Sequence, residues 1–292
     1  MELFNFNKIK LLGKGASAEV YLVKEIDTEV KYAMKVSEKV TGRATKERDI
    51  LKALDHPFII PLIYNFQDDD RIYMILPHCE RGDLYGYMKK REGSCFTKAE
   101  VKYYASCILL AIQYLHFMGI VYRDLKLENI LLLSSGRIIL TDFDLSFFHN
   151  KITTKSYKKI GTVSEPDVTM YEKNGTLEYL APEMVQSKPY TCIIDWWSFG
   201  ILIYEMFYGK TPFVDPSIEK IYRNISEGNL KFSDHTPKDR PISKKGKSVI
   251  KKLLKLEPNK RLGYEGGALE IQNHPFFHNL NFYRLYDQDP IF

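Results

Sequence analysis

The residues best suited to chemistry lie in the stretch 121–133, which reads VYRDLKLENILLL. It places the carboxylate of Asp124 five positions before the amide of Asn129, with the ammonium group of Lys126 between them. A carboxylate can take a proton from a hydroxyl group, an amide oxygen can bind a metal ion, and a lysine can stabilise developing negative charge. Together these groups suit phosphoryl transfer. An exposed charged turn would also explain the Arg-Asp-Leu-Lys string, so the interpretation depends on further motifs.

A lysine on an apolar strand is the second chemical feature. Lys35 lies in the run YAMKV, where a buried ammonium group needs an anionic partner. The candidates are the phosphates of ATP and Glu47, which lies in a segment whose apolar residues have helical spacing. The alternative for Glu47 is a solvent-exposed helix carboxylate between Lys46 and Arg48.

Two further segments can contact a metal ion or phosphate. Asp142 follows the apolar run IIL, and a carboxylate at the end of a strand can bridge Mg²⁺ to phosphates. Gly13 and Gly15 lie in a predicted turn, and glycines let backbone amide groups approach phosphate closely. A plain hairpin explains these two glycines equally well.

The elements that must position these residues follow from hydrophobic periodicity. Residues 6–36 alternate apolar and polar side chains, as strands do. Residues 71–84 indicate a buried strand and a turn that opens a helix, and residues 98–118 indicate a helix. In residues 244–255, apolar side chains run between lysines at helical spacing. This favours the solvated face of an amphipathic helix over a contact with nucleic acid.

Composition sets broad limits. At 292 residues and 45% apolar content, the chain can form one large or two moderate domains. The net charge of +5 is weak evidence about any partner, and the four cysteines show no metal or redox spacing. The N-terminus lacks the apolar core of a signal peptide, and polar residues interrupt the uncharged stretch 103–122, which favours a buried helix over a membrane span. We expect a cytoplasmic or nuclear protein that does not bind nucleic acid.

Three strings then occur in the order found in one large enzyme family. Tyr122 precedes the Arg-Asp pair, residues 175–183 read GTLEYLAPE, and residues 195–200 read DWWSFG. With the strand lysine and the other motifs, they resemble the AGC group of eukaryotic protein kinases, which includes the cyclic AMP-dependent protein kinase. The resemblance covers residues 6–277.

The resemblance implies an α+β fold with two lobes that form one protein kinase domain. The N-lobe, 1–78, would hold a small antiparallel sheet and one main helix. The C-lobe, 79–292, would be larger and mainly helical, with an activation segment at 142–183. The activity implied is transfer of the γ-phosphate of ATP to Ser or Thr of protein substrates, with Mg²⁺.

The resemblance also implies site roles, position by position. The positions that match catalytic residues are Asp124, Lys126, Lys35, Glu47 and Thr176. Those that match Mg²⁺ ligands are Asn129 and Asp142. Those that match nucleotide contacts are Leu12, Gly13, Lys14, Gly15, Ala16, Ser17, Ala18, Val20, Ala33, Lys35, Leu76, Pro77, Cys79 and Asp83. Two structural contacts are also implied: Glu183 with Arg261, and Asp195 with the backbone of the catalytic loop.

The chain departs from the family in places. Ala18 replaces the third glycine of the glycine-rich loop, and Asp144 replaces the glycine after Asp142-Phe143, where a positive φ helps the segment switch. The chain also stops soon after Leu280, so its last aromatic residues, or a partner such as a regulatory subunit, would replace the family's C-terminal tail. These departures motivate one alternative, a non-catalytic nucleotide-binding scaffold.

Two expectations concern regulation and substrate choice. Related kinases carry a phosphorylated Thr where this chain has Glu172, so we expect Glu172 to pair with Arg123 and Arg43, with a solvated glutamate as the alternative. Three carboxylates match positions that bind arginines upstream of the target residue in basophilic kinases: Asp83, Glu128 and Glu205. Internal pairing with a lysine or arginine is the alternative for Glu205.

Overall fold

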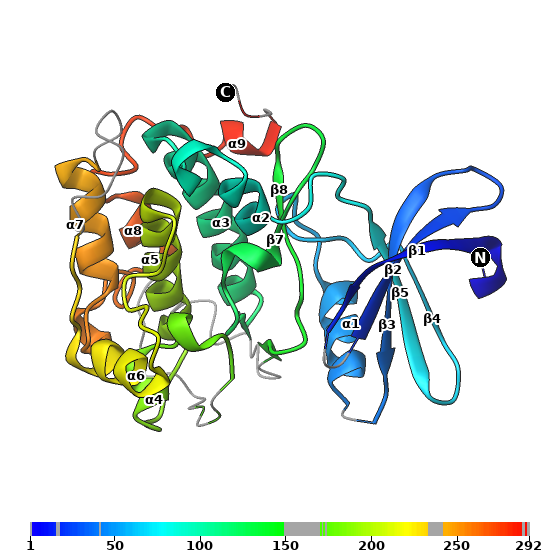
Figure 1. Ribbon diagram of the computed structural model, residues 1–292, viewed down its shortest axis with the longest axis horizontal. Coiled ribbons are helices and arrows are strands. Elements are labelled where there is room, and N and C mark those ends of the chain that lie inside the picture. Colours follow the sequence, from blue (N-terminus) through cyan, green and yellow to red (C-terminus); the bar gives the residue numbers. More distant parts are fainter. Residues whose placement is uncertain are drawn as a thin grey trace.

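The computed structural model describes residues 2–15, 18–40, 42–148, 170, 172, 174–232, 242–287 and 290. They form two lobes, a sheet with one helix against it and a larger lobe built mainly of helices (Figure 1). This confirms the predicted α+β class with a small antiparallel sheet. The positions Ala16, Ser17, Lys173 and Phe292, and most of the activation segment, lie outside the described residues.

The small lobe is a five-stranded antiparallel sheet in the order β1-β2-β3-β5-β4. Its strands are β1 (Phe6–Lys14), β2 (Ala18–Glu25), β3 (Lys31–Glu38), β4 (Tyr64–Gln67) and β5 (Arg71–Pro77). A short 3₁₀ helix, η1 (Leu3–Asn5), precedes them. Helix α1 (Arg43–Ala53) packs against one face of the sheet (Figure 1).

The period-two pattern of β5 separates the two faces of the sheet. Tyr73 and Ile75 belong to a small core with Phe6, whereas Met74 and Leu76 join the main core, as does α1. Lys35 is paired with Met74 across the β3–β5 ladder. Directly paired residues share a face, so Lys35 lies on the side of the sheet that α1 covers.

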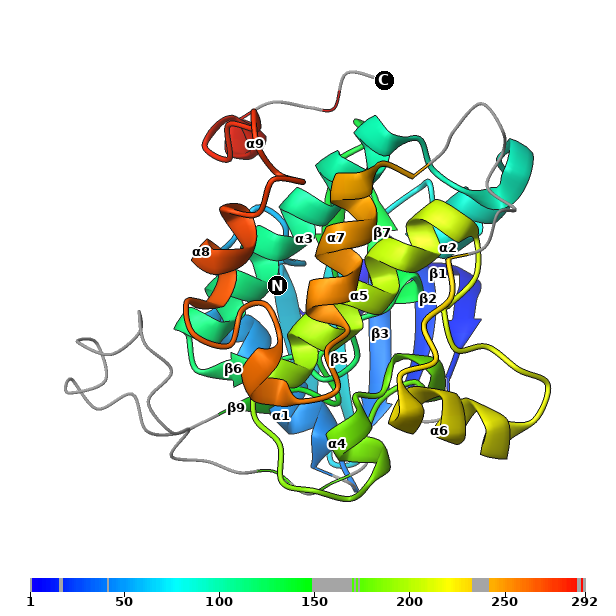
Figure 2. The same cartoon turned by 90° about the vertical axis from the view of Figure 1, so that its left-hand side faces the viewer.

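The large lobe is built around a buried helix, α5. Its helices are α2 (Leu84–Lys89), α3 (Lys98–Phe117), α4 (Pro182–Val185), α5 (Ile193–Tyr208), α6 (Ile218–Glu227), α7 (Lys244–Leu253), α8 (Gly267–Gln272) and α9 (Arg284–Asp287). Its 3₁₀ helices are η2 (Glu92–Ser94), η3 (Leu127–Asn129), η5 (Leu177–Tyr179) and η6 (Pro258–Lys260). Every α5 residue except the last is buried, and the helix lies between α3 and α7 (Figure 1). Figure 2 views the large lobe from the side of α7, which lies in front of α5.

Local signals explain where these helices begin. Thr97 caps α3 and forms a reciprocal capping box with Glu100, and the side chain of Asp83 accepts a hydrogen bond from the amide of Gly86 at the start of α2. Helix α7 confirms the amphipathic interpretation of residues 244–255, because Val249 and Ile250 are fully buried while most of its lysines are exposed. Across the residues that the structure describes, no helix is both long and apolar enough to cross a membrane.

Two small ladders carry the segments predicted to do chemistry. They pair β6 (Ile120–Val121) with β9 (Phe147–Phe148), and β7 (Ile130–Leu132) with β8 (Ile138–Leu140). The stretch around Asp124 connects β6 to β7, and Asp142 follows β8. Strand β8 also joins the lobes, because the amide of Leu140 donates to Phe58 O and the amide of Ile60 donates to Leu140 O, both at 2.9 Å.

Candidate active site

Asp124 is the centre of a compact hydrogen-bonded group. Its side chain is 6% exposed and accepts hydrogen bonds from donors on three residues. Lys126 Nζ and Asn129 Nδ2 donate to Oδ2 at 2.8 and 2.9 Å, and the amide and hydroxyl of Thr176 donate to Oδ1 at 3.1 and 3.0 Å. Lys126 Nζ also donates to Thr176 Oγ1 at 2.9 Å. These contacts bring together four predicted residues and hold the carboxylate in one orientation.

A second group forms around Lys35. Its ammonium nitrogen lies 2.7 Å from Glu47 Oε1 and 2.8 Å from Asp142 Oδ1. Burial alone would lower the pKa of Lys35, but the charges of Glu47 and Asp142 outweigh it and raise this pKa above its ordinary value, so the side chain stays cationic. Glu47 is 2% exposed, which excludes the exposed-carboxylate alternative.

The two groups are connected through the backbone beside them. The amide of Thr141 donates to Asn129 O at 2.9 Å, and the hydroxyl of Tyr122 donates to Thr141 O. Asp142 itself has a φ of 60°, in the left-handed region. This conformation presents its carboxylate to Lys35 and is rare for residues other than glycine, which is typical of residues held for function.

Asp144, which stands where the family has a glycine, has its backbone outside the left-handed region. The described residues outside glycine that have positive φ include Asp142 but not Asp144. Aspartate at position 144 therefore adopts no strained backbone in this state. Burial and the charge of Asp142 raise the pKa of Asp144, and the cations of Lys35 and Arg43 oppose the rise.

The donor set at Asn129 and Asp142 fits Mg²⁺. The Nδ2 group of Asn129 makes two hydrogen bonds to Asp124, to its backbone oxygen and its Oδ2, each at 2.9 Å, so the orientation of its Oδ1 is fixed. The Asp142 side chain is 39% exposed. Two oxygen donors of this kind, completed by phosphate oxygens, are the ligands that Mg²⁺ prefers.

The predicted nucleotide contacts lie along the strands that face this site. Gly13 is paired with Val20 and Val20 with Lys35, so the glycine-containing turn lies beside the strand that carries the lysine. The turn closes through the amide of Gly15, which donates to Ala18 O at 2.8 Å. Lys14 pairs with Glu19 at 2.9 Å in an exposed contact. Alanine at position 18 is therefore compatible with a closed turn.

The remaining predicted contacts lie on the small-lobe sheet and in the segment that follows β5. Leu76 is 5% exposed and is paired with Ala33, while Pro77 ends β5. Cys79 is half-buried, and burial raises the pKa of its thiol to about 11. Asp83 acts as the cap of α2, and Leu12 is 41% exposed on β1. Their contacts with a nucleotide stay predictions.

Asp195 holds the backbone just before the proposed base, Asp124. Its Oδ2 and Oδ1 accept hydrogen bonds from the amides of Tyr122 and Arg123, each at 2.9 Å, as predicted. His116 Nε2 lies 2.8 Å from the same Oδ2, a contact that sequence reasoning missed. The predicted pair of Glu183 with Arg261 is also present, with two short contacts at 2.7 and 2.9 Å.

Glu205 has a partner that sequence reasoning did not identify. It is 5% exposed on α5, and the hydroxyl of Tyr179 donates to its Oε2. The predicted alternative, an internal pair with a lysine or arginine, is absent among the described contacts of Glu205. Lys89 is near enough to affect its charge but donates to Gly209 O at 2.6 Å. The negative charge of the exposed Glu128 carboxylate helps to raise the pKa of Glu205.

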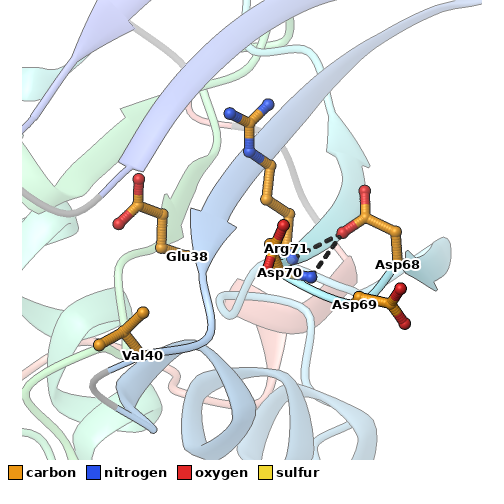
Figure 3. Close-up of a pocket in the computed structure, with 6 residues that line it drawn as sticks. All are labelled: Glu38, Val40, Asp68, Asp69, Asp70 and Arg71. Carbon is orange, nitrogen blue, oxygen red and sulfur yellow. Dashed lines mark hydrogen bonds between the residues drawn. The ribbon is translucent and has the colours of Figure 1, made fainter.

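A separate hollow of about 480 Å³ opens on the small lobe, between the end of β3 and the β4–β5 turn (Figure 3). It is lined by Glu38, Val40, Asp68, Asp69, Asp70 and Arg71. Its acidic turn is closed by internal hydrogen bonds, because the amides of Asp70 and Arg71 donate to Asp68 Oδ1 (Figure 3). None of the predicted site residues lines this hollow.

Comparisons with known proteins agree with this geometry. The protein kinase domain family matches residues 6–277. The chain is 41% identical to Serine/threonine-protein kinase nrc-2 of Neurospora crassa, over 94% of this chain and 47% of that protein. It is 37% identical to Flippase kinase 1 of Saccharomyces cerevisiae, over 98% of this chain and 33% of that protein.

A third relative is Serine/threonine-protein kinase gad8 of Schizosaccharomyces pombe, 37% identical over 96% of this chain and 46% of that protein. The chain thus spans between a third and half of the length of these three relatives. The family match covers nearly all of the chain, and the motifs that it predicts meet in one site. The chain therefore belongs to the protein kinase family, in the AGC group of Ser/Thr kinases.

Proposed function

We propose that this chain transfers the γ-phosphate of ATP to serine or threonine side chains of protein substrates, in intracellular signalling. The observation that carries the proposal is the convergence of Lys126, Asn129 and Thr176 on Asp124, beside the Lys35–Glu47–Asp142 group. A test is transfer of label from radiolabelled ATP to a mixed pool of basic peptides, with and without Mg²⁺. Retained ATP binding without any transfer would favour the scaffold alternative.

The proposed mechanism relies on positioning and electrostatics. Asp124 takes the proton of the acceptor hydroxyl, and Thr176 keeps its Oδ1 in place. Lys126 neutralises charge that develops on the transferred group. Lys35, held by Glu47, orients the phosphates. Asn129 and Asp142 would hold Mg²⁺, which would supply positive charge to the phosphate oxygens.

A buried carboxylate on α5 supports a proposal about the substrate class. Glu205 is buried with a neutral tyrosine hydroxyl as its partner, and Glu128 adds a second carboxylate nearby. Burying such a carboxylate is costly unless a cation compensates it when substrate binds. We therefore propose that an arginine of the substrate, upstream of the target Ser or Thr, binds Glu205 and Glu128. Arginine suits this role better than lysine, since its planar guanidinium can bind carboxylates through two hydrogen bonds.

We expect an arginine two or three residues before the acceptor to raise kcat/KM at least about tenfold over alanine. Removing one partner of a desolvated charge pair typically costs about 2 to 5 kcal/mol, which is more free energy than a tenfold change in kcat/KM requires. Steady-state kinetics on matched peptides with Arg, Lys or Ala at these positions measure the preference.

The Glu205→Gln variant should lose most of this preference while ATP binding stays unchanged. Glu257→Gln is the matched control, because Glu257 is an exposed glutamate of the same lobe that pairs with Lys260 on the surface. A peptide series that gains nothing from arginine, or prefers acidic residues, would overturn the arginine-directed assignment and leave the kinase assignment standing.

The arginine preference should also depend on pH. Burial raises the pKa of Glu205 to about 7; the Tyr179 hydrogen bond and Lys89 oppose the shift, and Glu128 and Glu178 add to it. A carboxyl with pKa near 7 is about one-tenth ionised one unit below that pH and about nine-tenths ionised one unit above. The ratio of kcat/KM for Arg over Ala peptides should therefore rise as pH increases through 7. A flat ratio in wild type, or the same rise in Glu205→Gln, would contradict this role.

A further inference from the structure

Arg123 is a buried cation next to the proposed base. Its side chain is 7% exposed, and its φ of 68° lies in the left-handed region. The Nε group donates to Leu145 O at 2.6 Å, and the guanidinium lies 5.5 Å from the centre of the Phe147 ring. The hydroxyl of Tyr190 is 3.4 Å from Nη1. These neighbours are neutral. Burying a guanidinium cation costs free energy unless a negative charge lies nearby as well.

Glu172 supplies the negative charge. Its Oε2 lies 3.4 Å from Arg123 Nη1, the ion pair recorded for this guanidinium among the described residues. Although Glu172 is 73% exposed, it is held in place by its neighbours. The hydroxyl of Tyr190 donates to Glu172 O at 2.6 Å, and Asn174 Nδ2 donates to its Oε2 at 2.8 Å.

The chain that follows Glu172 packs directly onto the catalytic loop. Gly175 has a φ of 115°, and a Cβ added there would lie 2.7 Å from Arg123 O, so only glycine permits this approach. The next residue, Thr176, donates two hydrogen bonds to Asp124. Glu172 thus contacts Arg123, and Thr176, four positions later, contacts the proposed base.

We infer that Glu172 is a built-in positioning residue, whose carboxylate holds residues 174–176 against the catalytic loop without phosphorylation at position 172. A serine or threonine at position 172 would need a phosphate to supply negative charge there, whereas a glutamate is charged at neutral pH. One carboxylate charge is smaller than the charge of about −1.5 to −2 on a phosphate, so the contact is permanent but weaker. The inference rests on the proposed kinase function, because the contact aligns the proposed base.

The first test uses protein made in bacteria and treated with phosphatase, with the absence of phosphate checked by intact mass. The wild type should keep its activity. Glu172→Gln, which removes the charge but keeps the shape, should lower kcat/KM about three- to tenfold, the size expected for a charged contact with one exposed partner. Glu227→Gln is the matched control, because Asn229 Nδ2 donates to Glu227 Oε2 at 2.8 Å in an exposed contact without an arginine.

The effect should depend on Arg123. In an Arg123→Met background, Glu172→Gln should cause no further loss of kcat/KM, because the cation with which Glu172 pairs is absent. Acetate added to Glu172→Ala should restore part of the activity, and it should restore none in the Arg123→Met, Glu172→Ala double variant. A merely structural role of Glu172 would show neither the rescue nor the dependence on Arg123.

Hydrogen exchange gives a readout that does not need activity. The amide of Thr176, which is bonded to Asp124 Oδ1 at 3.1 Å, should exchange slowly in wild type, faster in Glu172→Gln and unchanged in Glu227→Gln. Faster exchange together with an inactive wild type would support the positioning role and reject the kinase proposal. The inference is overturned if phosphatase treatment abolishes wild-type activity, or if Glu172→Gln keeps both full activity and slow Thr176 exchange.

Discussion

The Asp124→Asn variant should lose about 10²- to 10⁴-fold in kcat while its affinity for ATP stays near that of wild type. A positioned general base typically contributes this factor, and asparagine cannot accept the proton of the acceptor hydroxyl. The substitution keeps the size of the side chain, and its one oxygen can still accept the two hydrogen bonds that Thr176 donates to Oδ1. Single-turnover phosphorylation of a basic peptide measures the loss, and a separate titration with nucleotide measures ATP binding.

The control for Asp124→Asn is Asp49→Asn. Asp49 is a 57% exposed carboxylate on α1 that pairs with the neighbouring Arg48, so its loss should leave kcat unchanged. Thermal unfolding of both variants separates a chemical defect from a folding defect. Equal activity of wild type and Asp124→Asn would remove Asp124 from the proton transfer and would require a different base.

Much of this site could be predicted because its chemistry is encoded over short distances. Six consecutive positions contain Asp124, Lys126 and Asn129. The 3₁₀ helix η3 places the Asn129 side chain within hydrogen-bond distance of the Asp124 carboxylate. The contact of Lys35 with Glu47 was also predictable, since a lysine on an apolar strand needs an anionic partner and a glutamate lies on the helix that follows it.

Other contacts depend on tertiary packing that no local pattern reports. Tyr179 reaches Glu205 from a segment 26 residues away, and His116 reaches Asp195 across 79 residues. A buried carboxylate predicts that some partner exists, but the choice between tyrosine, lysine and arginine is set by which side chains the packing of α5 brings near. The position of the left-handed backbone, at Asp142 and not at Asp144, likewise follows from how the chain leaves β8.

The largest expected effect on stability comes from the pair that Arg261 forms with Glu183. Arg261 Nη1 and Nη2 donate to the two Glu183 oxygens at 2.7 and 2.9 Å, and the two side chains are 0% and 6% exposed. Arg261 also donates to Ile193 O at 3.1 Å and lies 5.3 Å from the centre of the Trp197 ring, so it joins the segment after α7 to the start of α5. We expect Arg261→Met to lower the free energy of unfolding by about 3 to 5 kcal/mol, because it leaves the Glu183 carboxylate buried and unpaired.

The chain contains its own control for this prediction at the next residue. Lys260 Nζ lies 2.8 Å from Glu257 Oε1, a distance similar to those in the buried pair, but these two side chains are 63% and 60% exposed. Water screens such a pair, so Lys260→Met should change the free energy of unfolding by less than about 1 kcal/mol. Urea unfolding of both variants, and of Arg261→Met combined with Glu183→Met, measures the difference. The double variant should recover part of the lost stability, since it removes the unpaired charge. If Arg261→Met costs no more than Lys260→Met, the buried pair does not hold the large lobe together.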